Sequence, residues 1–248
     1  MTQKAKVFCL GLSRTGTSSL CAALEVLGHQ SVHYPIHLFT QREVIGAGTF
    51  RPQLKLGPYR SWRRRKEIKA LACLDTRKIL QNKDAFGDLP IPLFYRQLDQ
   101  MFPGSKFILT SRGLEGWLKS MKWLFDDGGV IWQRGQIGDE LHWEVYGTTS
   151  FDRDHLARVF MNHIDAIESY FYGRDHDYCH LIIDQGDLTY DRLKAFLGVD
   201  SSYTGACPQV NEARSATTQE RLSKSMQRTL PFMIVKILLR RLNYFKLG

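Results

Sequence analysis

The sequence predicts an α/β fold of three layers, in which a central, mostly parallel sheet is flanked by helices. Short apolar runs that end at glycine or at polar residues alternate with segments of helical periodicity, which is typical of βαβ units. In the first unit an apolar strand over 6–10 is followed by a helix over 17–27 and a second strand over 31–34. This order predicts parallel pairing with a right-handed crossover.

The rest of the chain continues the alternation. Further strands are expected over 106–111 and 179–183, and helices over 62–74, 90–101, 113–125, 152–172 and 188–197. The helix over 152–172 is the most regular, because its apolar residues recur along one face. Four glycines between 128 and 138 predict a long loop.

Composition and charge restrict the class of protein. The 248 residues are 43% hydrophobic and 24% charged, as in a globular protein, and the net charge of +9 indicates an anionic partner. No nucleic-acid-binding module is recognised, so a phosphorylated small molecule or a membrane surface is favoured over nucleic acid. The five cysteines show no CxxC spacing, which predicts reduced thiols in a cytoplasmic protein and no bound metal.

A glycine-rich segment joins the first strand to the first helix. It reads Gly11-Leu12-Ser13-Arg14-Thr15-Gly16-Thr17-Ser18. The N–H groups of such a loop and the positive end of the following helix attract anions, so residues Ser13, Arg14, Thr15, Gly16, Thr17 and Ser18 are expected to bind phosphate. A Walker A loop has lysine after its second glycine, whereas this chain has Thr17 there and its basic residue at Arg14.

A second basic residue follows the strand over 106–111. Arg112 comes directly after this strand, and Ser120 lies eight residues later in the predicted helix. A guanidinium at a strand tip can bind phosphate through two parallel hydrogen bonds, and a nearby helix can add a hydroxyl. Because parallel sheets bind ligands at the carboxyl ends of their strands, we expect this site at the same edge as the glycine-rich loop.

Together these segments resemble the PAPS-dependent sulfotransferases, which have a P-loop-like fold. Arg14-Thr15-Gly16-Thr17 is similar to the 5′-phosphosulfate loop of the bacterial-type branch, and Arg112 with Ser120 is similar to the 3′-phosphate site. The resemblance implies in-line transfer of a sulfuryl group from PAPS to a hydroxyl or amine, giving PAP, with Arg14 stabilising the leaving group. The chain departs from the family at Ser19, where relatives often have tryptophan, and at Gly113-Leu114, where many have Asp-Pro.

A third likeness lies near the end of the expected domain. Phe196-Leu197-Gly198 is similar to a helix end in these enzymes, after which a loop returns to the 3′-phosphate. The resemblance implies that Asn211 and Arg214 contact this phosphate, while a solvent-facing role for both stays open. The sulfotransferase domain is therefore expected over 1–216.

Two side chains are candidates for the general base that sulfuryl transfer requires. Asp88 precedes Leu89-Pro90, where some relatives carry a catalytic histidine, and His33 ends the second strand. Each has a structural alternative, because Asp88 suits an N-cap of a helix that starts at Pro90, and His33 suits a buried, hydrogen-bonded histidine. Asp88 is the first candidate and His33 the second.

The last residues, 217–248, predict a basic amphipathic helical extension. Its apolar stretch is too short and too charged to span a bilayer. It could dock on the domain, form a dimer contact, or make peripheral contact with a membrane. The last alternative would suit a lipid or glycan acceptor, and a small-molecule acceptor is also compatible with the sequence.

Two other functions stay open. A P-loop kinase or NTPase draws support from Leu181-Ile182-Ile183-Asp184, which is similar to a Walker B strand, but the Walker A lysine is missing. A non-catalytic nucleotide-binding protein of the same fold would keep the phosphate sites and lack an effective base.

Overall fold

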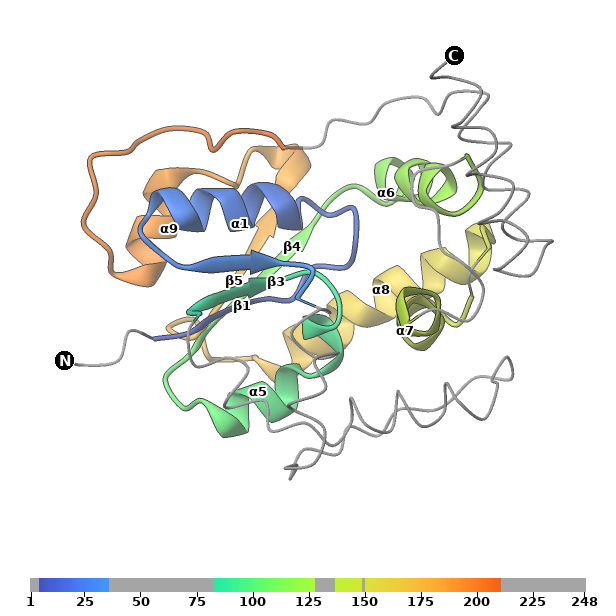
Figure 1. Ribbon diagram of the computed structural model, residues 1–248, viewed down its shortest axis with the longest axis horizontal. Helices are drawn as coiled ribbons and strands as arrows, with labels where there is room; N and C mark the ends of the chain where they lie inside the picture. Colours follow the sequence, from blue (N-terminus) through green and yellow to red (C-terminus); the bar gives the residue numbers. More distant parts are fainter. Residues whose placement is uncertain (1–4, 36–82, 128–136, 149, 211–248) are drawn as a thin grey trace, which may run out of the picture.

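The computed structural model describes residues 5–35, 83–127, 137–148 and 150–210 (Figure 1). In this part of the chain a single parallel sheet has the strand order β2-β3-β1-β4-β5. The strands are β1 (Val7–Cys9), β2 (Ser31–His33), β3 (Ala85–Gly87), β4 (Lys106–Ser111) and β5 (Tyr178–Ile182). The predicted α/β class and the parallel sheet are confirmed.

Helices lie on both faces of the sheet and beyond one of its ends. The described helices are α1 (Thr17–Val26), α5 (Tyr95–Met101), α6 (Leu114–Lys122), α7 (Ile137–Tyr146), α8 (Arg153–Tyr170) and α9 (Tyr190–Leu197). Helices α1 and α9 cover one face, and α5 and α8 cover the other, so the sheet is the middle of three layers (Figure 1). Helices α6 and α7 lie past the carboxyl ends of the strands (Figure 1).

The alternation of side chains along β1 explains the two faces. Val7 and Cys9 pack with α1 and α9, whereas Phe8 and Leu10 pack with α5 and α8. Successive side chains of a strand point to opposite faces, and all four of these residues are fully buried. A strand covered on both faces is apolar without interruption, which is why this run was recognisable in the sequence.

Two local expectations were wrong, and one strand was missed. The segment 90–101 is not one helix but a 3₁₀ turn over Ile91–Leu93 followed by α5, because the backbone of Phe94, with φ of −116°, departs from helical values between the two. Gly138 lies inside α7 and not in a loop. Strand β3 was not expected, because three residues are too few to show an alternating pattern.

Other expectations fall outside the described residues. These are the helix over 62–74, the other three glycines of the expected loop, and the extension over 217–248. Within the described residues, no helix combines the length and the apolar character needed to cross a bilayer.

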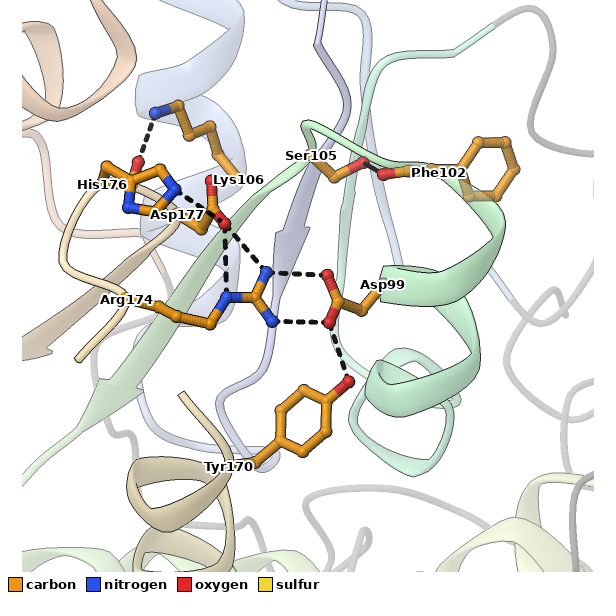
Figure 2. A network of polar contacts seen from close by, with 8 residues as sticks. All are labelled: Asp99, Phe102, Ser105, Lys106, Tyr170, Arg174, His176 and Asp177. Atoms are coloured by element: carbon orange, nitrogen blue, oxygen red, sulfur yellow. Dashed lines mark hydrogen bonds and ion pairs between the residues drawn. The ribbon is translucent and has the colours of Figure 1, made fainter. Parts of the chain in front are cut away.

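A network of ion pairs ties the layers together at the amino end of the sheet (Figure 2). Arg174, just after α8, donates to both carboxylate oxygens of Asp99 on α5, at 2.6 and 2.9 Å, and to Asp177 before β5 at 2.8 Å. Tyr170 donates to Asp99 at 2.7 Å. The hydrogen bonds from Arg174 hold the pKa of the Asp99 carboxyl below its usual range. This network therefore joins α5, α8 and β5 at the end of the sheet away from the glycine-rich loop.

A histidine connects α8 to the chain as it leaves β1. The Nε2–H of His163 donates to the carbonyl of Leu10 at 2.8 Å, and burial lowers the pKa of His163 to about 4. Above the unfolded pKa of about 6.5 the ring is neutral in both states. As the pH falls from there towards 4, only the unfolded chain takes up this proton. The free energy of unfolding then decreases by up to about 1.4 kcal/mol per pH unit.

We expect His163→Gln to remove this pH dependence, because glutamine keeps an N–H donor for Leu10 but does not titrate. Urea unfolding of the full chain at about pH 7 and about pH 5 measures the difference in the free energy of unfolding. The natural chain should lose more stability between the two conditions than the variant. Equal losses would contradict the role given to His163.

Candidate functional site

A cavity of about 780 Å³ lies at the carboxyl ends of the strands. This edge is where parallel α/β sheets bind ligands. Every strand of the sheet is followed by residues that line the cavity, namely Ser13–Ser19 after β1, His33 and Tyr34 at the end of β2, Asp88 after β3, Arg112 after β4 and Asp184 after β5.

Most of the predicted site residues come together here. Those that line the cavity are Ser13, Arg14, Thr15, Gly16, Thr17, Ser18, His33, Asp88 and Arg112. Ser120 instead contacts the side chain of Arg14. Asn211 and Arg214 lie outside the described residues.

The segment that precedes Asn211 is fastened to α1. The backbone N–H of Val210 donates to Oγ of Ser19 at 2.9 Å, and both Val210 and Gln209 line the cavity. A small hydroxyl residue at position 19 thus brings this segment to the cavity. The chain thus lines the cavity up to position 210, directly before Asn211 and four residues before Arg214, the two residues expected to contact the ligand.

The glycine-rich loop turns sharply between β1 and α1. Only glycine fits at position 11, because a Cβ there would come within 2.0 Å of Oγ1 of Thr110. The hydroxyl of Thr15 donates to the carbonyl of Leu12 at 2.7 Å and closes the turn. Gly16, with φ of 87°, precedes α1, and no side chain caps this helix end. A helix N-terminus without a side-chain cap attracts anions through its backbone N–H groups.

Backbone strain collects at the cavity. Among the described residues other than glycine, positive φ angles occur at Arg14 (71°), Tyr34 (52°) and Asp88 (64°), and all three residues line the cavity. Such conformations cost of order 1 kcal/mol or more each, and they persist where surrounding contacts hold them. The structure therefore holds this end of the sheet in conformations that the isolated chain would not favour.

The guanidinium of Arg14 is held by α6 and the turn after it. Its Nε donates to Oγ of Ser120 at 2.8 Å, and it lies over the ring of Trp123, 5.0 Å from the centroid. Burial lowers the pKa of Arg14, and the positive charge of Arg112 lowers it further, against the opposite effect of Asp88. Two cations at one cavity repel each other, so an anion bound there would relieve that repulsion.

Arg112 is anchored by the aspartate that follows β5. Oδ1 of Asp184 lies 3.3 Å from Nη2 of Arg112, and its Oδ2 accepts a hydrogen bond from the backbone N–H of Gly113 at 2.9 Å. The Nε of Arg112 is buried without a hydrogen-bond partner. The guanidinium as a whole is partly exposed and lines the cavity, so an anion in the cavity can bind its accessible side.

Asp184 is similar to a Walker B aspartate in sequence, but in the structure it binds groups of the protein itself. Both of its oxygens are engaged, one by Arg112 and one by the start of α6. Within the described part of the chain, no three His, Cys, Asp or Glu side chains are grouped as a metal site would require. Asp184 orients the arginine at the tip of β4.

Asp88 and His33 form a pair in the cavity wall. Oδ2 of Asp88 lies 3.3 Å from Nε2 of His33, and its Oδ1 accepts hydrogen bonds from Ser13 Oγ and from the following backbone N–H, both at 2.8 Å. The helical segments after Asp88 have no side-chain cap, so the N-cap interpretation is wrong. His33 is exposed, so it is not the buried histidine of the structural alternative, and its Nε2 also lies within 3.1 Å of the hydroxyls of Thr17 and Ser18.

Sequence reasoning missed the residues that hold the loop from behind. The hydroxyl of Tyr146 on α7 accepts a hydrogen bond from the N–H of Ser13 at 3.0 Å, across 133 positions of sequence. Nε1 of Trp117 on α6 donates to the carbonyl of Ser13, also at 3.0 Å. Trp117 is fully buried and stacks on Phe160. No spacing rule relates Tyr146 to the loop.

Known proteins provide an independent comparison. The family model of the sulfotransferase domain matches residues 6–216. A curated relative, Ava biosynthesis cluster protein M of Aspergillus versicolor, is 30% identical over 155 residues, which are 61% of this chain and 51% of that protein, so the chain spans about half of its length. A solved structure, the sulfotransferase of Alicyclobacillus acidocaldarius, is similar at 13% identity and a TM-score of 0.46, over 91% of this chain and 93% of that one.

The match to the family model includes all the residues that line the cavity and all five strands of the sheet. It also contains both arginines on which the resemblance rested. This protein belongs to the sulfotransferase domain family.

Proposed function

We propose that the chain transfers a sulfuryl group from PAPS to a hydroxyl or amine and releases PAP. The observation that carries this proposal is that Arg14 and Arg112 reach one cavity together with the uncapped N-terminus of α1. All three features attract phosphate and sulfate groups. The loop 13–18 would hold the 5′-phosphosulfate, and Arg112, which lines the same cavity, would hold the 3′-phosphate.

We assign to Arg14 the role of stabilising the leaving group. Electrostatic stabilisation is most effective when the charged group is already oriented before the reaction. The contacts of Arg14 with Ser120 and with the ring of Trp123 supply that orientation. Ser120 thus supports Arg14 on the 5′ side of the site, and its contact with the 3′-phosphate beside Arg112 stays a prediction.

We assign to Asp88 the role of general base, which takes the proton from the acceptor group, and His33 is its partner. Oδ1 of Asp88 already accepts two hydrogen bonds, so Oδ2 is the oxygen that we assign to proton transfer. Its neighbour is Nε2 of His33, at 3.3 Å. A carboxylate and an imidazole paired at the cavity support a catalytic function over nucleotide binding alone.

The kinase alternative has less support. The loop carries Thr17 where a Walker A lysine would bind phosphate, and both oxygens of Asp184 are engaged by protein groups. For the acceptor we propose a small molecule, a lipid or a glycan with a free hydroxyl or amine. Peripheral membrane contact through 217–248 accompanies the lipid alternative.

Ligand-dependent thermal stability separates the two donor classes. We expect PAP at about 100 times its Kd to stabilise the chain by about 2.7 kcal/mol, which raises Tm by roughly 5–10 °C for a domain of this size. ATP with magnesium should give a smaller shift at the same concentration. Differential scanning fluorimetry of the full chain measures both, and stabilisation by ATP-magnesium alone would refute the donor assignment.

Replacing Arg14 tests its catalytic role. Because a preorganised donor at a developing charge contributes about 100-fold or more, Arg14→Ala should lower kcat by at least about 100-fold in a labelled-PAPS transfer assay. The matched control is Arg153→Ala, since Arg153 pairs with Glu115 and does not line the cavity. The control should keep kcat within about twofold, and a similar result for Arg14→Ala would refute the assigned role.

Two conservative replacements distinguish the catalytic role of Asp88 from that of His33. Asp88→Asn keeps an oxygen that can accept from Ser13 Oγ but removes the basic carboxylate, so kcat should fall by about 100-fold or more while PAP affinity changes little. His33→Gln should have a smaller effect on kcat, and Asp165→Asn on the exposed side of α8 serves as the charge-matched control. A larger loss in His33→Gln than in Asp88→Asn would reverse the assignment.

A further inference from the structure

Ser13 is held by a side chain at each of its polar groups. Its N–H donates to the hydroxyl of Tyr146, its carbonyl accepts from Nε1 of Trp117, and its Oγ donates to Asp88, at 3.0, 3.0 and 2.8 Å. All of these contacts are buried. We call Tyr146 and Trp117, which hold the backbone of this residue, the Ser13 clamp.

The clamp holds both peptide groups of Ser13, Trp117 the one that directly precedes Arg14 and Tyr146 the one before it. The carbonyl held by Trp117 belongs to the peptide that joins Ser13 to Arg14, and the φ angle of Arg14 sets the orientation of this peptide relative to its side chain. That φ angle is 71°, a conformation that side-chain-bearing residues adopt rarely. Without the clamp, the peptide would be free to rotate towards an ordinary φ and to carry the guanidinium away from its present contacts.

The same helix holds both ends of this arrangement. Trp117 and Ser120 are three residues apart on α6 and therefore neighbours on its surface, and Trp123 begins the π-helical segment Trp123–Asp127 that continues α6. Trp117 contacts the backbone before Arg14, whereas Ser120 and Trp123 contact its guanidinium. Backbone and side chain of one residue are thus oriented by one rigid element.

Helix α7 completes the clamp and also forms part of the cavity wall. His142 lines the cavity, and its ring stacks on that of Tyr146, one helical turn later, at a centroid distance of 5.6 Å. Tyr146 is fully buried and packs edge-on against Phe125. Packing explains why positions 117 and 146 carry aromatic rings. It does not explain why the polar atoms of both side chains form hydrogen bonds with the N–H and the carbonyl of Ser13.

We propose that Tyr146 and Trp117 are positioning residues that act through Arg14. Tyr146 holds the Leu12–Ser13 peptide and Trp117 holds the Ser13–Arg14 peptide, so that the guanidinium lies on Ser120 and Trp123 at the cavity. Neither residue touches the transferred group. The clamp deepens the proposed function, because it rests on Arg14 as the residue that binds the donor.

The first test needs no ligand. Tyr146→Phe removes the hydroxyl and keeps the ring, and Tyr170→Phe, which removes a hydroxyl from the network around Asp99, is the matched control. Nitrogen-15 NMR of the full chain measures exchange of the Nε–H of Arg14 with water. We expect about tenfold faster exchange in Tyr146→Phe, as loss of one buried hydrogen bond implies, and less than twofold in the control. Unchanged exchange in Tyr146→Phe overturns the proposal.

Trp117→Phe gives a second, independent variant, because it removes Nε1–H and keeps an aromatic ring against Phe160. It should also accelerate exchange at Arg14. If both variants leave the exchange rate of this N–H unchanged while they remain folded by circular dichroism, the clamp has no positioning role.

The second test measures coupling to the donor site. Isothermal titration of the full chain with PAP should show about fivefold weaker binding in Tyr146→Phe, and less than twofold further weakening when the same change is made in Arg14→Ala. Equal weakening in both backgrounds overturns the claim that Tyr146 acts through Arg14. Failure of the natural chain to bind PAP would instead refute the donor assignment. The exchange measurement would still show whether the clamp positions Arg14.

Discussion

The three hydrogen bonds of Ser13 are the contacts on which the rest of the site depends. They join the glycine-rich loop to β3, α6 and α7, which are separated from it by 75 to 133 positions of sequence. A loop that must present N–H groups to an anion cannot use those groups to fix its own shape. In this protein, buried side chains hold Ser13 instead. No side chain caps the N-terminus of α1.

Charge balance is the second constraint on this cavity. Arg14 and Arg112 repel each other, and burial makes Arg14 costly to keep charged without a partner. Asp184 partly compensates Arg112, whereas Asp88 lies close enough to favour the charged form of Arg14. This compensation is incomplete, since Nε of Arg112 has no partner. The cavity is thereby ready for an anion, and the carboxylate that we assign to proton transfer also stabilises the loop.

The two ends of the sheet differ in their energetics. At the amino end, Arg174 binds Asp99 and Asp177 in a network of short hydrogen bonds (Figure 2). At the carboxyl end, three described residues other than glycine have positive φ and line the cavity. Strained conformations persist only where the remaining structure holds them. The ion-pair network at the amino end and the packed layers of the sheet supply that support to the residues with positive φ at the cavity.

The sequence by itself determined the α/β class, the glycine-rich loop and the places of Arg14 and Arg112, because each rests on a local pattern beside a buried strand. It also placed His33 at a strand end and identified Asp88 as a candidate base from its position before Leu89-Pro90. Only the tertiary structure decided that these two side chains meet, that Ser120 contacts Arg14 and that Tyr146 holds Ser13. Strand β3 was too short to recognise, and the partners of a side chain depend on how distant elements pack. Local spacing carries no information on such contacts, because they arise only when the helices close over the edge of the sheet.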